Sequence, residues 1–229
     1  LGALSVLFLA TTIFLWRKLN VANHIKEPKS ADNNIWRGFM PWLIIAYGLE
    51  GLGYIITGTF LVDIIYNIES LRAYAGYSWV LAGLAAIPSA PIWMKCMSRF
   101  SPVSMMTTAY SLQIIGILLP VLSQSAWSVL VSAMSFGFTF VGLVTMSTAY
   151  ARQLFPKQSN YVVSILTTFY AIGQIIGPVI ASRLETHFRT FKAPLLFAGG
   201  TVTVALVLLL VGYFYSRKSP VHLAVDIKY

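Results

Sequence analysis

Charged residues are scarce in this sequence of 229 residues, at 10% of the chain, and acidic residues are the scarcer kind. Seven Asp and Glu stand against sixteen Lys and Arg, which gives a formal net charge of +9. A water-soluble domain carries about a quarter charged residues, so the composition excludes a soluble core. Nucleic-acid binding is not favoured either, because the positive residues lie at the ends of apolar runs, as they do on the inner side of membrane proteins.

Cysteine is nearly absent as well. Cys96 is the single cysteine, and this excludes an intrachain disulfide. No cluster of His, Cys and carboxylates has metal-ligand spacing, and no glycine-rich phosphate loop is present. A membrane-embedded enzyme would need paired acids, a His pair or a Ser/Lys dyad at membrane depth. We therefore expect no metal, no cofactor and no enzymatic activity.

Long apolar runs are what the sequence has instead. Hydrophobic residues make up 57% of the chain, and the mean hydropathy is +0.74. The runs fall at residues 1–16, 39–66, 74–97, 103–122, 126–151, 161–182 and 193–215. The last six are long enough to cross a hydrocarbon layer of ~30 Å as helices, whereas the first is too short. The predicted fold is an all-α, polytopic membrane protein: a six-helix bundle preceded by a partial helix.

Four parts follow along the chain. We expect the end of a truncated helix at 1–16, a cytoplasmic linker at 17–36, the six-helix bundle at 37–216 and a cytoplasmic tail at 217–229. With this orientation twelve of the sixteen Lys and Arg are cytoplasmic, as the positive-inside rule requires. Arg183, Arg189 and Lys192 form a local exception on the outer side. The prediction is thus a multi-pass protein of the plasma (inner) membrane.

The six full spans divide into two triplets, 39–122 and 126–215, that share a weak symmetry. The second helix of each is interrupted late in the span by proline, at Pro88 and Pro91 in one and at Pro178 in the other. Each of these helices is followed by an expected basic loop, MKCMSRF or SRLETHF. Because each triplet has an odd number of spans, the two would have opposite membrane orientations, as in the inverted repeats of secondary transporters.

Glu50 is an acid deep inside the first full span. It lies roughly 12 Å along the helix from Trp42, where a charge costs at least ~2.5 kcal/mol, so it should face protein or water. On a helical wheel it shares a face with four other residues, with Gly51 and Gly58 at the border. These four are Tyr47, Tyr54, Thr57 and Leu61. We interpret this face as the wall of a substrate pathway, with Glu50 coupling transport to a proton or cation; the alternative is a structural carboxylate bonded to a neighbouring helix.

Other spans carry polar and small residues at helical spacing. Gln113 follows Tyr110 on the fourth run, and Gln174 follows Tyr170 on the sixth. We place these two amides and Tyr170 in the candidate pathway, although amides in membrane helices also simply tie helices together. Small residues that favour close packing, or sliding during gating, are Gly48, Gly51, Gly173 and Gly177, the last followed by Pro178.

Three stretches carry a resemblance to a known family. They are AYGLEGLGYIITGTFLVDII at 46–65, the run 109–156 with its SFGFTFVG segment, and FYAIGQIIGPVIAS at 169–182. In order and spacing the sequence resembles the carboxy-terminal half of the YbfB/YjiJ branch of the major facilitator superfamily. The superfamily's G-x-L-x-D-R-x-G loop would fall on 94–101, where only Arg99 matches, so the gating role of that loop is not expected here.

The resemblance implies a twelve-helix carrier of two six-helix bundles around a central cavity, working by alternating access powered by an ion gradient. Residues 1–16 would be the end of helix six, and the chain a fragment that lacks the amino-terminal bundle. The predicted function is secondary active transport of a small solute, coupled to a proton or another cation. The alternative is a non-transporting polytopic membrane receptor or scaffold. Expected partners are the solute, membrane lipid and the amino-terminal bundle, with no nucleic acid.

Overall fold

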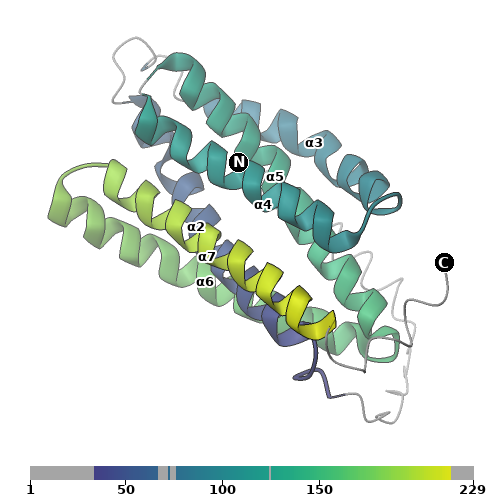
Figure 1. The fold of residues 1–229 in the computed structure, drawn as a ribbon. Helices are drawn as coiled ribbons and strands as arrows, with labels where there is room; N and C mark the ends of the chain where they lie inside the picture. The colour runs from purple at the N-terminus through teal and green to yellow at the C-terminus, as the bar shows by residue number, and fades with distance from the viewer. Residues whose placement is uncertain (1–33, 67–71, 73–75, 124, 218–229) are drawn as a thin grey trace, which may run out of the picture. The chain divides into compact units, whose positions relative to one another are not determined.

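The computed structural model describes residues 34–66, 72, 76–123 and 125–217, and these belong to one compact unit (Figure 1). The partial helix expected at 1–16 lies outside the described residues. So do most of the linker expected at 17–36 and all but the first residue of the tail expected at 217–229. The fold below is therefore that of the six-helix part of the chain.

Six long helices make up this part, as the apolar runs predict. They are α2 (Met40–Tyr66), α3 (Tyr77–Met97), α4 (Pro102–Leu122), α5 (Ala126–Leu154), α6 (Ser159–Phe188) and α7 (Lys192–Arg217), with a short 3-10 helix, η2 (Pro156–Gln158), between α5 and α6. All six are long and apolar enough to cross a membrane. The prediction of an all-helical, multi-pass membrane protein is confirmed.

Helices α3 and α6 continue into the two expected basic loops, and this corrects those loops. Most of MKCMSRF lies in the last turn of α3, which ends at Met97, and all of SRLETHF lies within α6. Lys, Arg, Leu, Met and Glu are good helix formers, so the helices continue after the sequence has become polar. The end of α6 is set instead by Arg189, whose φ of 50° is left-handed and so stops the helix.

The prolines lie inside continuous helices. Pro88 and Pro91 fall within α3, and Pro178 falls within α6, so the expected interruptions are not breaks in the helix. Proline removes one N–H donor, and neighbouring helices can satisfy the backbone groups it frees in a membrane protein. Beside these prolines, Ser89 Oγ and Trp93 Nε1 both donate to the Phe138 carbonyl of α5, at 2.5 and 2.9 Å.

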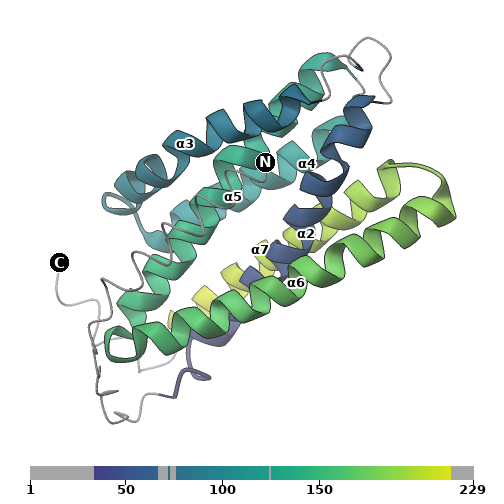
Figure 2. The same ribbon diagram turned by 180° about the vertical axis from the view of Figure 1, so that it is seen from behind.

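The helices form two layers, one of α3, α4 and α5 and the other of α2, α6 and α7 (Figures 1 and 2). Within the layers, α5 packs on α3 and α4, and α2 packs on α6 and α7; α4 and α7 join the layers. The first helix of each triplet thus packs against the second and third helices of the other triplet. A two-fold exchange of the triplets preserves this pattern, which is what an inverted repeat requires.

Helix α2 is the most buried of the six candidate spans. Its side chains Leu43, Ile44 and Ile56 have no exposed surface, and the core continues through residues such as Met106, Leu143 and Leu166 of the neighbouring helices. A helix that is apolar nearly all round is expected in the interior of a membrane bundle. Glu50 and Thr57 of α2 are therefore enclosed by protein, whereas Thr59 and Asp63 of the same helix are exposed.

Candidate functional site

The polar face predicted on α2 lies inside the bundle. Glu50 and Thr57 are 0% and 1% exposed, and Tyr47 and Tyr54 are buried with them; the side chain of Leu61 is outside the described residues. Glu50 faces protein, which is one of the two environments predicted for it. Its side chain has no exposed surface, and the pathway role of this face is a proposal.

Gln113 of α4 is the hydrogen-bond partner of Glu50. Its Nε2 donates to Oε1 of Glu50 at 2.9 Å, in a fully buried position. The second carboxyl oxygen of Glu50, Oε2, and the amide oxygen of Gln113, Oε1, have no partner among the described residues. A buried polar atom without a hydrogen bond costs about 1–3 kcal/mol, so two such atoms side by side mark an incompletely satisfied site.

No positive charge neutralises Glu50 within the described part of the chain. The groups that interact with its carboxyl are the Gln113 amide and four phenols, those of Tyr47, Tyr54, Tyr110 and Tyr170. Helix α4 has no charged residue at all, and α5 and α7 carry theirs only near their ends. A lone carboxyl in an apolar interior is costly as an anion, because nothing replaces its hydration.

Helix α4 reaches this site through long side chains. Its backbone packs on α5 and α7, yet Gln113 extends to Glu50, and Tyr110, one turn earlier, donates its hydroxyl to the Ala46 carbonyl of α2 at 3.3 Å. Both side chains are buried. These two hydrogen bonds tie one layer of the bundle to the central helix of the other.

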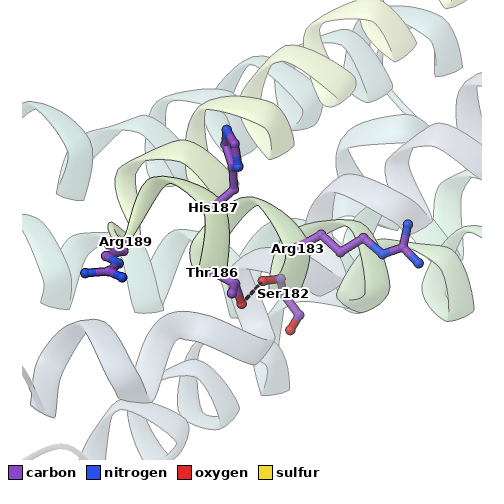
Figure 3. Close-up of a pocket in the computed structure, with 5 residues that line it drawn as sticks. All are labelled: Ser182, Arg183, Thr186, His187 and Arg189. Atoms are coloured by element: carbon purple, nitrogen blue, oxygen red, sulfur yellow. Dashed lines mark hydrogen bonds between the residues drawn. The ribbon is translucent and has the colours of Figure 1, made fainter.

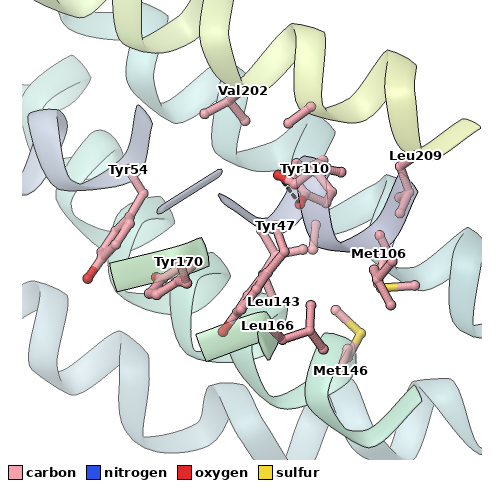
Figure 4. Packing of buried hydrophobic residues seen from close by; sticks show 14 of the residues in the cluster. Tyr47, Tyr54, Met106, Tyr110, Leu143, Met146, Leu166, Tyr170, Val202 and Leu209 are labelled. Carbon is pink, nitrogen blue, oxygen red and sulfur yellow. Dashed lines mark hydrogen bonds between the residues drawn. The ribbon is translucent and has the colours of Figure 1, made fainter. Parts of the chain in front are cut away.

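An aromatic column surrounds the Glu50 face. It consists of the stacked rings of Tyr47, Tyr170, Tyr54, Phe136 and Phe140. Tyr170 of α6 stacks between Tyr47 and Tyr54 of α2, with centroids 4.4 and 5.6 Å away (Figure 4). The two phenylalanines of α5 continue the stack beyond Tyr54 at 5.5 and 5.3 Å. Near-parallel stacking fixes the planes of the rings, and with them the positions of the phenol oxygens.

Gln174 lies at the other end of the tyrosine pair. Its Nε2 donates to the Tyr54 hydroxyl at 2.7 Å, and its side chain is part-exposed. It comes one turn before Gly177 and Pro178, where an interruption of the helix was expected. Because α6 is continuous there, the position of Gln174 is explained by its bond to Tyr54 and not by a break.

Glycines allow the helices around the site to touch. A Cβ at Gly173 of α6 would lie 2.3 Å from the Gly48 carbonyl oxygen of α2, and one at Gly51 would lie 2.7 Å from the Tyr170 carbonyl oxygen. A Cβ at Gly177 would lie 2.8 Å from the Leu52 carbonyl oxygen. The four predicted small residues therefore lie at the contact of α2 with α6, where main chains approach as closely as in other small-residue membrane interfaces.

The structure thus brings together six of the seven predicted pathway residues. They are Glu50, Tyr47, Tyr54, Gln113, Tyr170 and Gln174. Thr57 lies two turns further along α2, and its Oγ1 has no partner among the residues described. Sequence reasoning missed Phe136 and Phe140, although their spacing of four residues inside SFGFTFVG puts both rings on one face of a helix.

A surface pocket occurs elsewhere, at the carboxyl end of α6. It is lined by Ser182, Arg183, Thr186, His187 and Arg189, which include two of the three basic residues expected on the outer side. Figure 3 shows that the Arg183 and Arg189 side chains point in opposite directions, and that His187 lies across the helix from Ser182. The charges do not converge on one point, so we assign no ligand to this pocket. No metal-ligating cluster is present among the described residues either.

Comparison with known proteins agrees with this architecture. Residues 1–210 match the family model described as "Uncharacterised MFS-type transporter YbfB". This model covers most of the chain, including all of the residues of the site. No curated protein matches the sequence.

Proposed function

Because the chain belongs to the family of MFS-type transporters described as YbfB, we propose that it moves a small solute across the plasma (inner) membrane by proton-coupled alternating access. The solute would bind between this bundle and a second six-helix bundle. Membership makes the chain part of a transporter family and not an enzyme. We propose three further features: the coupling ion, the residues of the pathway, and an orientation with the carboxyl terminus in the cytoplasm.

The observation that carries the proposal is the state of Glu50. Its carboxyl is fully buried, has one hydrogen-bond partner and lacks a neutralising cation in the described part of the chain. Uptake of a proton removes the charge that the apolar surroundings penalise, and its release restores that charge. A rearrangement that admits water makes the charged form of such a carboxyl less costly and so promotes release of its proton. In this way proton binding and a conformational change can be coupled.

A proton suits this site better than a metal cation. Sodium sites in carriers draw on backbone carbonyls freed where helices unwind. Here α2 is helical through Glu50, α4 through Gln113 and α6 through Tyr170, so their carbonyls stay engaged in helix bonds. The oxygens without a partner near Glu50 are its own Oε2, Oε1 of Gln113 and the Tyr170 hydroxyl, whereas a proton needs only the first of them.

Proton flux in proteoliposomes tests this function. We expect the intact protein, reconstituted with a pH-sensitive dye inside the vesicles, to move protons when a pool containing its solute is added outside. Glu50→Gln keeps the size of the side chain and its bond to Gln113 but removes the titratable oxygen, so solute-driven proton movement should be lost. The matched control is Glu185→Gln, which removes a carboxyl near the end of α6, away from the site.

Equal proton movement in wild type and Glu50→Gln would remove Glu50 from the coupling mechanism. Solute uptake without any proton movement would replace the proton by another coupling ion. Solute binding without transport, in the wild-type protein, would favour the receptor or scaffold over the carrier.

A further inference from the structure

We propose that the hydroxyl groups of Tyr170 and Tyr54 form a proton path between the buried carboxyl of Glu50 and the part-exposed end of the row at Gln174. This inference rests on the proposed function, since it assumes that Glu50 binds a proton. It adds the route, which the family match does not supply. It also gives two tyrosines of the candidate pathway a specific role, the transfer of protons.

A route is needed because Glu50 has no contact with solvent. Its exposed fraction is 0%, so a proton that reaches Oε2 has to pass through other side chains. The side chains that interact with the carboxyl are the phenols of Tyr47, Tyr54, Tyr110 and Tyr170 and the amide of Gln113. Of these, a phenol can donate and accept at the same oxygen.

Tyr170 is the central member of the path. Its hydroxyl interacts with both the Glu50 carboxyl and the Tyr54 hydroxyl, yet it makes no hydrogen bond of good geometry within the described residues. Because Oε2 of Glu50 is also without a partner, a small movement of the phenol pairs two buried groups that are otherwise unsatisfied. Such a gain favours a Tyr170–Glu50 hydrogen bond in a neighbouring conformation.

Tyr54 links Tyr170 to the surface. Its hydroxyl accepts a hydrogen bond from Gln174 Nε2 at 2.7 Å, which leaves its own O–H free to turn towards Tyr170. The two rings stack at 5.6 Å with an interplanar angle of 16°, and Figure 4 shows Tyr170 lying between Tyr54 and Tyr47. Gln174 is part-exposed, so the row ends at the surface of the bundle, and the proposed path requires this surface to face the water of the solute cavity.

Each transfer along the path conserves atoms and charge. When Glu50 is an anion, the Tyr170 O–H gives its proton to Oε2 and its oxygen takes the Tyr54 proton. The Tyr54 oxygen then takes a proton from a hydronium ion at the Gln174 end, which leaves a water molecule. Each phenol breaks one O–H bond and forms another, so both end unchanged and one proton has moved inward. Rotation of the hydroxyls resets the row.

The other polar side chains around Glu50 do not continue to the surface in this way. The Tyr110 hydroxyl is engaged with the Ala46 carbonyl, and Tyr110 and Gln113 are both buried on α4. Tyr47 stacks on the far side of Tyr170 from Tyr54. The Tyr170–Tyr54 row is therefore the one whose far end bonds to a part-exposed polar group.

The path can be tested without knowing the solute. Infrared spectra of the purified full chain in lipid nanodiscs, recorded across a pH series, identify a protonated carboxyl C=O band that is absent in Glu50→Gln. After transfer into D2O, the rate at which this band shifts reports how fast the carboxyl exchanges its proton. We expect Tyr170→Phe and Tyr54→Phe, which keep the stacked rings, to slow this exchange roughly tenfold or more.

Tyr110→Phe is the matched control, because it removes a buried hydroxyl beside Glu50 that lies off the path. Its exchange should stay at the wild-type rate. If the carboxyl band titrates with pH but shifts in D2O at the same rate in all three Phe variants, the path is overturned. Glu50 would still be the proton site. The absence of any Glu50-dependent band over the pH series would overturn the proton site, and the path with it.

Discussion

At the scale of single residues, the pair of Glu50 and Gln113 joins two helices that are far apart in sequence. Each side chain satisfies one atom of the other and leaves one atom of its own without a partner. Replacing one member of such a pair leaves a buried polar group unpaired, whereas replacing both with apolar groups can be nearly neutral.

We therefore expect Gln113→Leu to lower the free energy of unfolding by about 1–3 kcal/mol. The double variant Glu50→Leu with Gln113→Leu should lose less than Gln113→Leu alone. Denaturant unfolding of the purified protein in detergent measures both. Gln153→Leu, exposed near the end of α5, is the control for loss of an amide. A double variant that is less stable than the single one would show that the pair acts through more than this hydrogen bond.

Most residues of this site could be predicted from the sequence, but the contacts between residues of different helices could not. Glu50 stands out because acids are rare in apolar spans, and its face with Tyr47 and Tyr54 follows from the helical period. Gln113 and Tyr170 were also candidates. The contact between Glu50 and Gln113 depends on the packing of α4 against α2 through α5 and α7, which no period in one helix reveals. Phe136 and Phe140 looked like ordinary core residues for the same reason.

At the scale of whole helices, the contact between α2 and α6 depends on glycine. The Gly173 Cβ position is 2.3 Å from the Gly48 oxygen and 2.8 Å from the Leu52 nitrogen. Both atoms belong to the helix backbone, which cannot turn aside as a flexible side chain can. An added methyl group must therefore push α6 away from α2 and pull Tyr170 out of the aromatic column.

Gly173→Ala should accordingly destabilise the protein by about 1–3 kcal/mol or more, although alanine is the better helix former. Gly200→Ala on α7, where a Cβ meets nothing within 4 Å, should be neutral or stabilising by up to about 1 kcal/mol. Thermal unfolding of the two variants in the same detergent compares them. Equal melting temperatures would show that α2 and α6 are not held at the distance seen here.

The helix ends show where a hydropathy pattern stops being informative. The runs located all six helices, but 183–188 was expected as a loop and is the last part of α6. Hydropathy marks where the chain leaves an apolar environment. Whether the helix continues is decided by propensity and by a terminating residue such as Arg189, whose left-handed φ is not evident from residue type.

At the scale of the whole molecule, the first helix of each triplet packs against the second and third helices of the other triplet. This arrangement agrees with an inverted repeat. The loop after α3 and the loop after α4 should then lie on opposite sides of the membrane. From the distribution of Lys and Arg we expect Ser101 on the cytoplasmic side and Ser123 on the outer side. Both residues are exposed and flank α4.

Cysteine labelling measures this orientation. In a Cys96→Ala background, a membrane-impermeant maleimide should label Ser123→Cys in intact cells and Ser101→Cys only in inside-out vesicles. The background lacks the single native thiol, so each signal comes from one position. Labelling of the two positions in the opposite preparations would invert the proposed topology and move the basic cluster at the end of α6 to the cytoplasmic side.

The burial of Glu50 has a consequence for how the protein is made. Gln113 lies 63 residues after Glu50 in the chain, so α2 is synthesised and reaches the lipid before its carboxyl has that partner. Tyr170, which closes the other side, is translated later still. During this interval an acid that hydrocarbon disfavours has to be kept in the insertion machinery or in the interface. Assembly of α2 therefore has to wait for α4 and α6, and the central helix of the finished bundle is among the last to settle.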